Sequence, residues 1–374
     1  MRFARTTISA VLLLIAAAVP VLGAQHNSPA AAPKISCPKM LDAYMDESGG
    51  VWCQLDTKTA SVSVLKSAEA AGLKRLKVTG KLGVEDIKAI AASTAARSLE
   101  ALDLSWNYMG VDCIVALAGG EFGKLSLLNI AYNETKAEGL KALAESGGFP
   151  KLTSLNIESG RLTAESVKEF VDSEFCKRLT SLYLGNNRLG DAGAAAIAGS
   201  KNLGGLTTLG FASNEVKDAG AAAIAESENL SSLNSLDLNY NRLGDDGATA
   251  IAGSRFADKL EYLNLNYNYI GGAGASALAN SPALANLAFL GLWHNNVGDT
   301  GAVAIANSPN FKKLVLLNLN YDDLSDAGIS ALADSAYLKK LKYLDVGNNA
   351  FGDAGAKALR KLKERGVEVI HESD

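Results

Sequence analysis

One pattern of about 27 residues recurs along most of the chain, and it constrains the fold more than any other feature. The clearest copy reads L-T-S-L-Y-L-G-N-N-R-L-G-D-A-G-A-A-A-I-A-G-S from Leu179. A constant period of this length is typical of solenoids, in which each copy packs only against its neighbours. Copies 1 to 10 begin at Leu99, Leu125, Leu152, Leu179, Leu206, Leu233, Leu260, Leu287, Leu314 and Leu341, and a degenerate copy precedes them at Leu73.

Each copy joins a strand pattern to a helix pattern. Alternating apolar residues such as Leu236 and Leu238 predict a short strand, and the Ala-rich stretch around Ile251 predicts a helix. One strand and one helix cannot bury a core alone, but stacked copies can. We therefore expect an α/β solenoid. Because strands pack more closely than helices, it should curve, with parallel strands on the concave face and helices on the convex face.

An asparagine follows the strand in eight copies. A buried asparagine has two donors and two acceptor lone pairs, so this column predicts a ladder that satisfies backbone groups of adjacent copies. Copies 3 and 9 carry Gly160 and Asp322 there, and their turns should be weaker or differently bonded. The ladder asparagines are Asn107, Asn133, Asn187, Asn214, Asn241, Asn268, Asn295 and Asn349.

The segment L-x-x-L-x-L-x-x-N resembles the signature of the leucine-rich-repeat superfamily. The following L-G-D-A-G-A-x-A-I-A helix is similar to that of the ribonuclease-inhibitor-like branch, which also includes Ran GTPase-activating proteins and the repeat domains of intracellular innate-immune receptors. This resemblance implies a right-handed α/β horseshoe that binds proteins. The chain departs from ribonuclease inhibitor in its few cysteines (4), its copies of constant length and its N-terminus. We carry over the architecture and the binding role, and no particular partner.

The first residues read as a secretory signal. Arg2 and Arg5 precede an apolar run that ends at small residues near Ala24. A membrane anchor is the alternative, but the run is short for a span of about 20 residues. We expect a signal at 1–24, a linker at 25–36, an N-terminal cap at 37–72, the array at 73–365 and a closing segment at 366–374. The mature chain should be secreted or otherwise extracytoplasmic, in a periplasm or at a cell surface, with no membrane span.

The four cysteines divide into two pairs. Cys37 and Cys53 flank a short segment before the repeats, and a disulfide between them would staple the N-terminal cap. Cys113 and Cys176 fall at positions where other copies carry small or apolar core residues. They are two copies apart, too far for a bridge. We expect two buried free thiols.

Charge and motifs argue against several function classes. The formal net charge is −4 and no basic stripe is present, so nucleic acid is not an expected partner. No nucleophile elbow, Cys/His cluster or phosphate loop is found, and we expect neither an enzyme nor a cofactor. One aspartate per copy, such as Asp218, cannot supply the 6–8 converging oxygens of calcium. In the first turn of a helix it is favoured by the helix dipole.

Aromatic residues gather on the expected concave face in copies 6 to 9. Exposed Trp and Tyr are the residue types that anchor interfaces. The alternative is that the tyrosines only stack across adjacent copies and stabilise the turns. The predicted partner-binding patch consists of Tyr240, Tyr262, Tyr267, Trp293, His294 and Tyr321.

The leading functional hypothesis is that an exported solenoid binds a protein ligand through its concave face. A modulator of a partner enzyme, either an inhibitor or an activator, is the second hypothesis. Export argues against a GTPase activator, because that substrate is cytosolic. A hydrolase is a distant third, since Glu158 has no second carboxylate in an adjacent copy on the inner face.

Overall fold

The computed structural model describes residues 37, 41–45, 51–58, 61–66 and 72–371. The predicted signal at 1–24 and linker at 25–36 lie outside the described residues. The chain forms two compact units, unit 1 up to Arg161 and unit 2 from Leu162 onward. Among the described residues, no helix has both the length and the apolar character that a membrane span requires.

Unit 1 begins with an antiparallel pair and continues as strand–helix copies. Strand β1 (Asp42–Met45) pairs antiparallel with β2 (Val51–Asp56), and β2 pairs parallel with β3 (Arg75–Thr79). The later strands are parallel and follow the order of the chain. The remaining elements are η1 (Val62–Lys66), α2 (Val84–Ala91), β4 (Ala101–Asp103), α3 (Val111–Ala118), β5 (Leu127–Asn129), α4 (Lys136–Ala144) and β6 (Ser154–Asn156).

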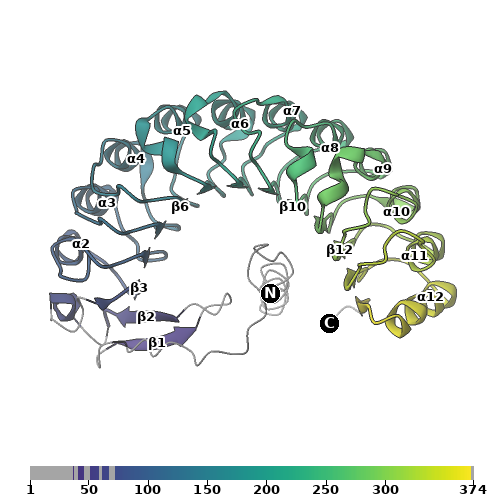
Figure 1. Ribbon diagram of the computed structural model, residues 1–374, viewed down its shortest axis with the longest axis horizontal. Helices are drawn as coiled ribbons and strands as arrows, with labels where there is room; N and C mark the ends of the chain where they lie inside the picture. Colours follow the sequence, from purple (N-terminus) through teal and green to yellow (C-terminus); the bar gives the residue numbers. More distant parts are fainter. Residues whose placement is uncertain (1–36, 38–40, 46–50, 59–60, 67–71, 372–374) are drawn as a thin grey trace, which may run out of the picture. The chain divides into compact units, whose positions relative to one another are not determined.

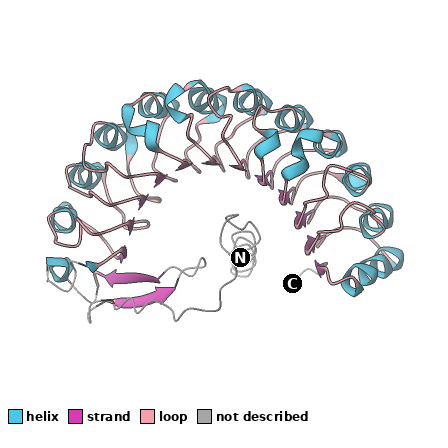
Figure 2. Cartoon of the chain, in the orientation of Figure 1, coloured by secondary structure: helices cyan, strands magenta, loops and turns pink. Residues whose placement is uncertain are grey.

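Unit 2 repeats the same alternation with parallel strands only. Within it, the strands gather on one face and the helices on the other (Figures 1 and 2). Its strands are β7 (Ser181–Tyr183), β8 (Thr208–Gly210), β9 (Ser235–Asp237), β10 (Tyr262–Asn264), β11 (Phe289–Gly291), β12 (Leu316–Asn318), β13 (Tyr343–Asp345) and β14 (Glu368–Ile370). Its helices are α5 (Ala164–Val171), η3 (Glu174–Arg178), α6 (Gly190–Gly199), η4 (Lys201–Leu203), α7 (Asp218–Glu226), α8 (Asp245–Ala252), η5 (Ala257–Lys259), α9 (Gly272–Asn280), η6 (Pro282–Asn286), α10 (Gly298–Ala306), α11 (Asp326–Ala333) and α12 (Asp353–Glu364).

The constant period places equivalent residues side by side. Leu236, Leu263 and Leu290 pair across β9, β10 and β11, and all three are completely buried. Because every second strand residue points away from this core, the intervening residues form a separate strand face. The α/β solenoid expected from the sequence is thereby confirmed.

The asparagine ladder bonds each copy to its neighbours. Asn268 is only 5% exposed. Its Nδ2 donates to the carbonyls of Leu238 and Leu265, each at 3.0 Å. Its Oδ1 accepts from the backbone N–H of Leu243 at 3.0 Å. These bonds satisfy backbone groups that stacking removes from water, as the sequence predicted.

The aspartate column forms a second ladder, which reaches forward by one copy. Oδ1 of Asp218 accepts from the N–H groups of Gly244 at 2.7 Å and Gly247 at 3.0 Å, at the start of α8. These are N–H groups that no helical carbonyl can satisfy. The sequence predicted a role for this aspartate at the start of its own helix, and the structure adds a cap on the next helix. Asp191, Asp245, Asp299 and Asp326 make the equivalent pair of bonds.

Where the preceding copy of unit 2 lacks this aspartate, a glycine takes another conformation. Copies 3 and 7 carry Ala164 and Gly272 at the aspartate position, and the following Gly190 and Gly298 both have φ +58°. Their N–H groups turn instead to a carbonyl of the next copy, at 2.7 Å for Gly190 and 2.8 Å for Gly298. Gly352, which follows an aspartate-bearing copy, has φ −104°. In copies 4 to 10, the aspartate of the preceding copy therefore determines how the helix begins.

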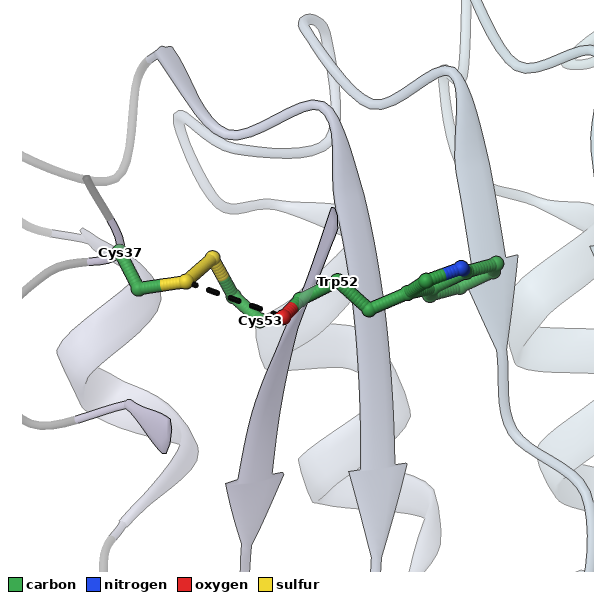
Figure 3. Close-up of a disulfide and its surroundings, with 3 residues drawn as sticks. All are labelled: Cys37, Trp52 and Cys53. Atoms are coloured by element: carbon green, nitrogen blue, oxygen red, sulfur yellow. Dashed lines mark hydrogen bonds between the residues drawn. A yellow bond between two sulfur atoms is a disulfide. The ribbon is translucent and has the colours of Figure 1, made fainter. Parts of the chain in front are cut away.

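The N-terminal cap contains a disulfide between Cys37 and Cys53, with a Cα–Cα distance of 5.6 Å. It links the segment before β1 to the middle of β2 (Figure 3). Sγ of Cys37 also lies 3.9 Å from the carbonyl oxygen of Trp52. This is a van der Waals contact, because the sulfur of a disulfide has no hydrogen to donate. Cys113 and Cys176 are free and buried, as predicted.

Candidate functional site

The candidate site is a row of residues that directly precede the ladder position. Each of them has a left-handed backbone, with φ between 52° and 56° for Tyr240, Tyr267, His294 and Tyr321. Bulky residues seldom adopt this conformation, which favours Gly and Asn. The turn after each strand imposes it, because the ladder residue that follows must point back into the core. The side chains in this row therefore point out of the core, at the edge of the strand face.

In unit 2 these side chains form a continuous stack. The rings of Tyr240 and Tyr267 lie 4.0 Å apart at an interplanar angle of 10°, and the ring of His294 lies 4.6 Å beyond Tyr267. Tyr321 continues the row at 5.8 Å from His294 with a tilt of 31°. Tyr240 and Tyr321 are 52% and 51% exposed, so the two outer members of the stack are open to a partner.

Trp293 joins the stack from the strand face. Its ring meets Tyr267 edge-on at 4.7 Å. Its backbone N–H donates to Oδ1 of Asn266 at 2.8 Å. Asn266 reaches across because Gly291 has no side chain, and a Cβ there would lie 2.6 Å from the same oxygen. Among the described residues, the indole Nε1 of Trp293 is buried and has no hydrogen-bond partner. We name Tyr240, Tyr267, Trp293, His294 and Tyr321 the aromatic cluster.

Tyr262, the sixth predicted residue, lies apart from this cluster. Its ring stacks on Phe289 of the next strand at 4.4 Å, on the strand face between β10 and β11. The pKa of Tyr262 is raised above its ordinary value, and the largest cause is burial. Phe289, Leu316 and Tyr343 stand in register with Tyr262 in the column of first strand residues, and none of these three was predicted as a site residue.

Other exposed aromatic residues were not predicted as site residues. Tyr269, two positions after Tyr267, is 71% exposed. In unit 1, Trp106 and Tyr132 stack at 3.8 Å and 12°, and Tyr108 beside them is 81% exposed. Trp106 and Tyr132 occupy the same repeat position as the residues of the unit 2 stack. An alignment of the copies was therefore sufficient to predict them as a second stack.

Polar residues of the strand face are largely engaged in backbone bonding. Oδ1 of Asp237 accepts from the N–H of Asn239 at 2.9 Å, and Asn264 and Asn318 make the equivalent bond in their own copies. Burial raises the pKa of Asp345, whose Oδ1 accepts from Gly347 at 3.1 Å. These side chains stabilise the ends of the strands. The aromatic side chains are not needed for this backbone bonding, so they are better placed to contact a partner.

The described residues offer no ready metal centre. Nowhere in the described ranges do three or more His, Cys, Asp or Glu side chains come together as a possible metal site. Five aspartates of the column that invited a calcium interpretation cap the following helices. Burial raises the pKa of Glu158, the strand-face carboxyl considered for catalysis, and its own N–H donates to Oδ1 of Asn156 at 3.0 Å.

Among the comparisons with known proteins, the family match agrees with the repeat pattern. A family model described as "Leucine Rich repeat" matches residues 175–198, 229–252, 259–279, 286–306 and 337–359. An internalin from Listeria monocytogenes is 18% identical, with a TM-score of 0.46 over 78% of this chain and 89% of that chain. The structure of Rad7 and Elc1 in yeast is 17% identical, with a TM-score of 0.44 over 84% of this chain and 79% of that chain. No curated protein matches the sequence.

The copies of unit 2 that the family model matches are leucine-rich repeats, the class that the sequence predicted. The family match coincides with copies of unit 2 whose strands, asparagine ladder and helices are described above. Proteins of this class typically mediate contacts between proteins. Membership of the ribonuclease-inhibitor-like branch stays a prediction.

Proposed function

We propose that the protein binds a protein ligand through the strand face of unit 2, with the aromatic cluster as the principal contact. The observation that carries this proposal is the exposed stack of Tyr240, Tyr267, His294 and Tyr321. Large, rigid aromatic side chains contribute most to binding energy at protein interfaces. Tyr262 and Phe289 form an adjoining pair on the same strand face.

The backbone at these positions supports a role beyond folding. A left-handed conformation costs an L-residue roughly 1–2 kcal/mol, and asparagine adopts it more readily. Asn186 and Asn348 occupy the same position in copies 4 and 10, with φ of 55° and 53°. The turn is thus built without an aromatic ring in those copies. Four successive rings in copies 6 to 9 are not a requirement of the array, although their mutual stacking offsets part of the cost.

Trp293 supports the proposal independently. An indole N–H is a donor only, and a buried donor without an acceptor costs about 1–3 kcal/mol. Because Nε1 is buried, a ligand carbonyl could satisfy it only after the indole turns outward, and that bond would relieve the cost on binding. Trp293 is half-buried against Tyr267, so the accessible part of its ring offers an apolar surface to such a ligand.

We further propose that the protein acts outside the cytoplasm. The support is the signal-like pattern of residues 1–24 together with the Cys37–Cys53 disulfide, since disulfides persist mainly in oxidising compartments. The mature N-terminus measured by mass spectrometry tests this. A chain that begins near Gln25 agrees with export, and a chain that retains Met1 contradicts it.

The binding proposal is tested by affinity capture with the secreted protein. The test variant is Trp293→Ala/Tyr267→Ala, and the matched control is Trp106→Ala/Tyr132→Ala, which removes a stacked pair from unit 1. Each variant is first shown to melt as one transition with wild-type helix content. We expect recovery of the partner to fall at least about tenfold for the unit 2 variant only. Equal recovery by all three proteins would contradict the proposal.

A further inference from the structure

Copy 9 carries the one carboxylic acid among the ladder positions of copies 1 to 10. Asp322 is completely buried. Its Oδ1 accepts from the backbone N–H of Asn295 at 3.1 Å and of Val297 at 3.4 Å. These are the bonds that Oδ1 of an asparagine accepts elsewhere in the ladder. Its Oδ2 is buried without a hydrogen-bond partner among the described residues. Copy 9 is therefore differently bonded, as the sequence predicted.

The neighbouring copies show what is missing. Nδ2 of Asn295 donates to the carbonyls of Leu265 at 3.0 Å and Leu292 at 2.6 Å. Nδ2 of Asn349 donates to the carbonyl of Leu319 at 2.8 Å. Because the copies are equivalent, Oδ2 of Asp322 takes the place of Nδ2. It then faces the carbonyl oxygens of Leu292 and Leu319. All three atoms are hydrogen-bond acceptors, so an ionised Oδ2 cannot bond to either carbonyl.

A proton on Oδ2 resolves this arrangement. A protonated carboxyl group has one O–H donor and keeps an acceptor oxygen, so it reproduces both functions of the ladder amide. An ionised carboxylate has no donor and would be buried at a large cost in free energy. Burial raises the pKa of Asp322 to about 8, against the N–H donors of Val297 and Asn295, which lower it.

Among the described residues, no charged side chain offsets the burial of Asp322, whose pKa is shifted only by burial and by two backbone N–H donors. On α10, Asp299 bonds to Ser325 and Gly328, and on α11, Asp326 bonds to the start of α12. Both have the charge that would repel an ionised Asp322. The other titratable groups on the elements packed around this turn are Asp345 and Tyr343 on β13, and His294, Tyr321 and Asp323 in the adjoining turns.

The acid lies directly beneath the aromatic cluster. Tyr321 is the preceding residue, and the two N–H groups that donate to Oδ1 belong to Asn295 and Val297, which follow His294 in its turn. The backbone carbonyl of Asp322 also accepts from Gly298 at 2.8 Å, at the helix start that no aspartate caps. Two departures from the repeat rule thus meet at one place, and such departures tend to concentrate at functional or strained sites.

We propose that Asp322 is a neutral, proton-donating member of the ladder, and that its ionisation loosens the turns of His294 and Tyr321 and so makes the aromatic cluster pH-sensitive. The first part concerns the folded chain alone. The second part rests on the proposed function, because it assigns the loosened turns to a binding surface.

The sign of the effect follows from proton binding. A carboxyl group with a raised pKa binds more protons in the folded chain than in the unfolded chain. Its contribution to stability is complete below its ordinary pKa of 3.8 and is lost as pH rises toward about 8. Stability should therefore fall across this window. An asparagine at the same position keeps the donor and the acceptor at every pH.

The test compares the melting temperatures of wild type and Asp322→Asn between pH 5 and pH 9. We expect Asp322→Asn to melt higher, with a gap that widens by several degrees as pH rises. A gap that stays constant across the range would overturn the proposal, because other groups titrate equally in both proteins. The reciprocal variant Asn268→Asp, which places an acid in copy 7, should melt lower than wild type by a margin that grows with pH.

Two controls separate the acid from its neighbours. Histidine also changes charge in this pH range, so both proteins are measured again with His294→Gln. A pH dependence that disappears with His294→Gln instead of Asp322→Asn would overturn the assignment. Quenching of tryptophan fluorescence by acrylamide reports on Trp293 when Trp52 and Trp106 are replaced by Phe. Quenching should rise toward pH 9 only in the protein that retains Asp322. These readouts need no ligand, so they can fail or succeed independently of the proposed function.

Discussion

The helix start at Gly298 provides a quantitative test of how the aspartate column works. Gly298 has φ +58°, and a Cβ placed there would have no atom within 4 Å. Gly352 occupies the same position two copies later with φ −104°, and its Cβ would come no closer than 3.5 Å to another atom. Replacement by alanine therefore meets no steric obstacle at either site. The two substitutions differ only in backbone conformation.

The expected magnitudes follow from this difference. A left-handed alanine costs roughly 1–2 kcal/mol, and the reduced freedom of the unfolded chain returns about 0.4–1 kcal/mol. We expect Gly298→Ala to lower the free energy of unfolding by about 1 kcal/mol, and Gly352→Ala, which has no left-handed cost, to raise it by about 0.4–1 kcal/mol. Urea unfolding followed by circular dichroism measures both, provided that the m-value is unchanged.

A double-mutant cycle then tests the cause. Gly272→Asp supplies copy 7 with the aspartate that copies 4 to 6 and 8 to 10 possess. Alone it crowds the present turn, because a Cβ at Gly272 would lie 3.0 Å from Cβ of Thr300. Together with Gly298→Ala it should draw residue 298 into the extended conformation. We expect a favourable coupling of about 1 kcal/mol between the two substitutions. Additive effects would refute the account of the aspartate column.

Three further outcomes are expected. Asn268→Ala leaves the buried N–H of Leu243 without a partner and removes one of the two ladder amides that donate to each of the carbonyls of Leu238 and Leu265. It should therefore destabilise unit 2 by about 1–3 kcal/mol, whereas Asn234→Ala, at an exposed position, should cost far less in the same urea titration. Replacement of Cys37 and Cys53 by serine opens a loop with a sequence separation of 16, which should cost about 3 kcal/mol; an unchanged melting curve for unit 1 would contradict this. Burial raises the pKa of the Cys176 thiol to about 12, so iodoacetamide at pH 8 should alkylate it only in denaturant, as peptide mass spectrometry can show.

The sequence predicted the parts of the fold that depend on residue type at a fixed period. Alternating leucines, the Ala-rich helices and the asparagine column each specify local structure. Stacking at a constant period then places equal residues side by side. For this reason the strand register and the buried ladder, with Asn241 between Asn214 and Asn268, agree with expectation.

The remaining features depend on distances between copies that no period reveals. Asp218 lies in the first turn of its own helix, and nothing in its local sequence shows that its carboxylate also reaches Gly244 in the next copy. The left-handed backbone of Gly298 follows from an absence in the previous copy, at Gly272. Tyr262 looked like a member of the aromatic cluster, but its partner Phe289 is defined by strand pairing.

The central claim, that the aromatic cluster contacts a protein ligand, is tested most directly by site-specific photo-crosslinking in the native cells. A benzophenone side chain is introduced at Tyr321 on the cluster and, as the matched control, at Val303 on α10, which is 39% exposed on the helix face of unit 2. The account predicts a discrete crosslinked partner from position 321 and none from position 303. The same partner captured from position 303, with none from position 321, would contradict it.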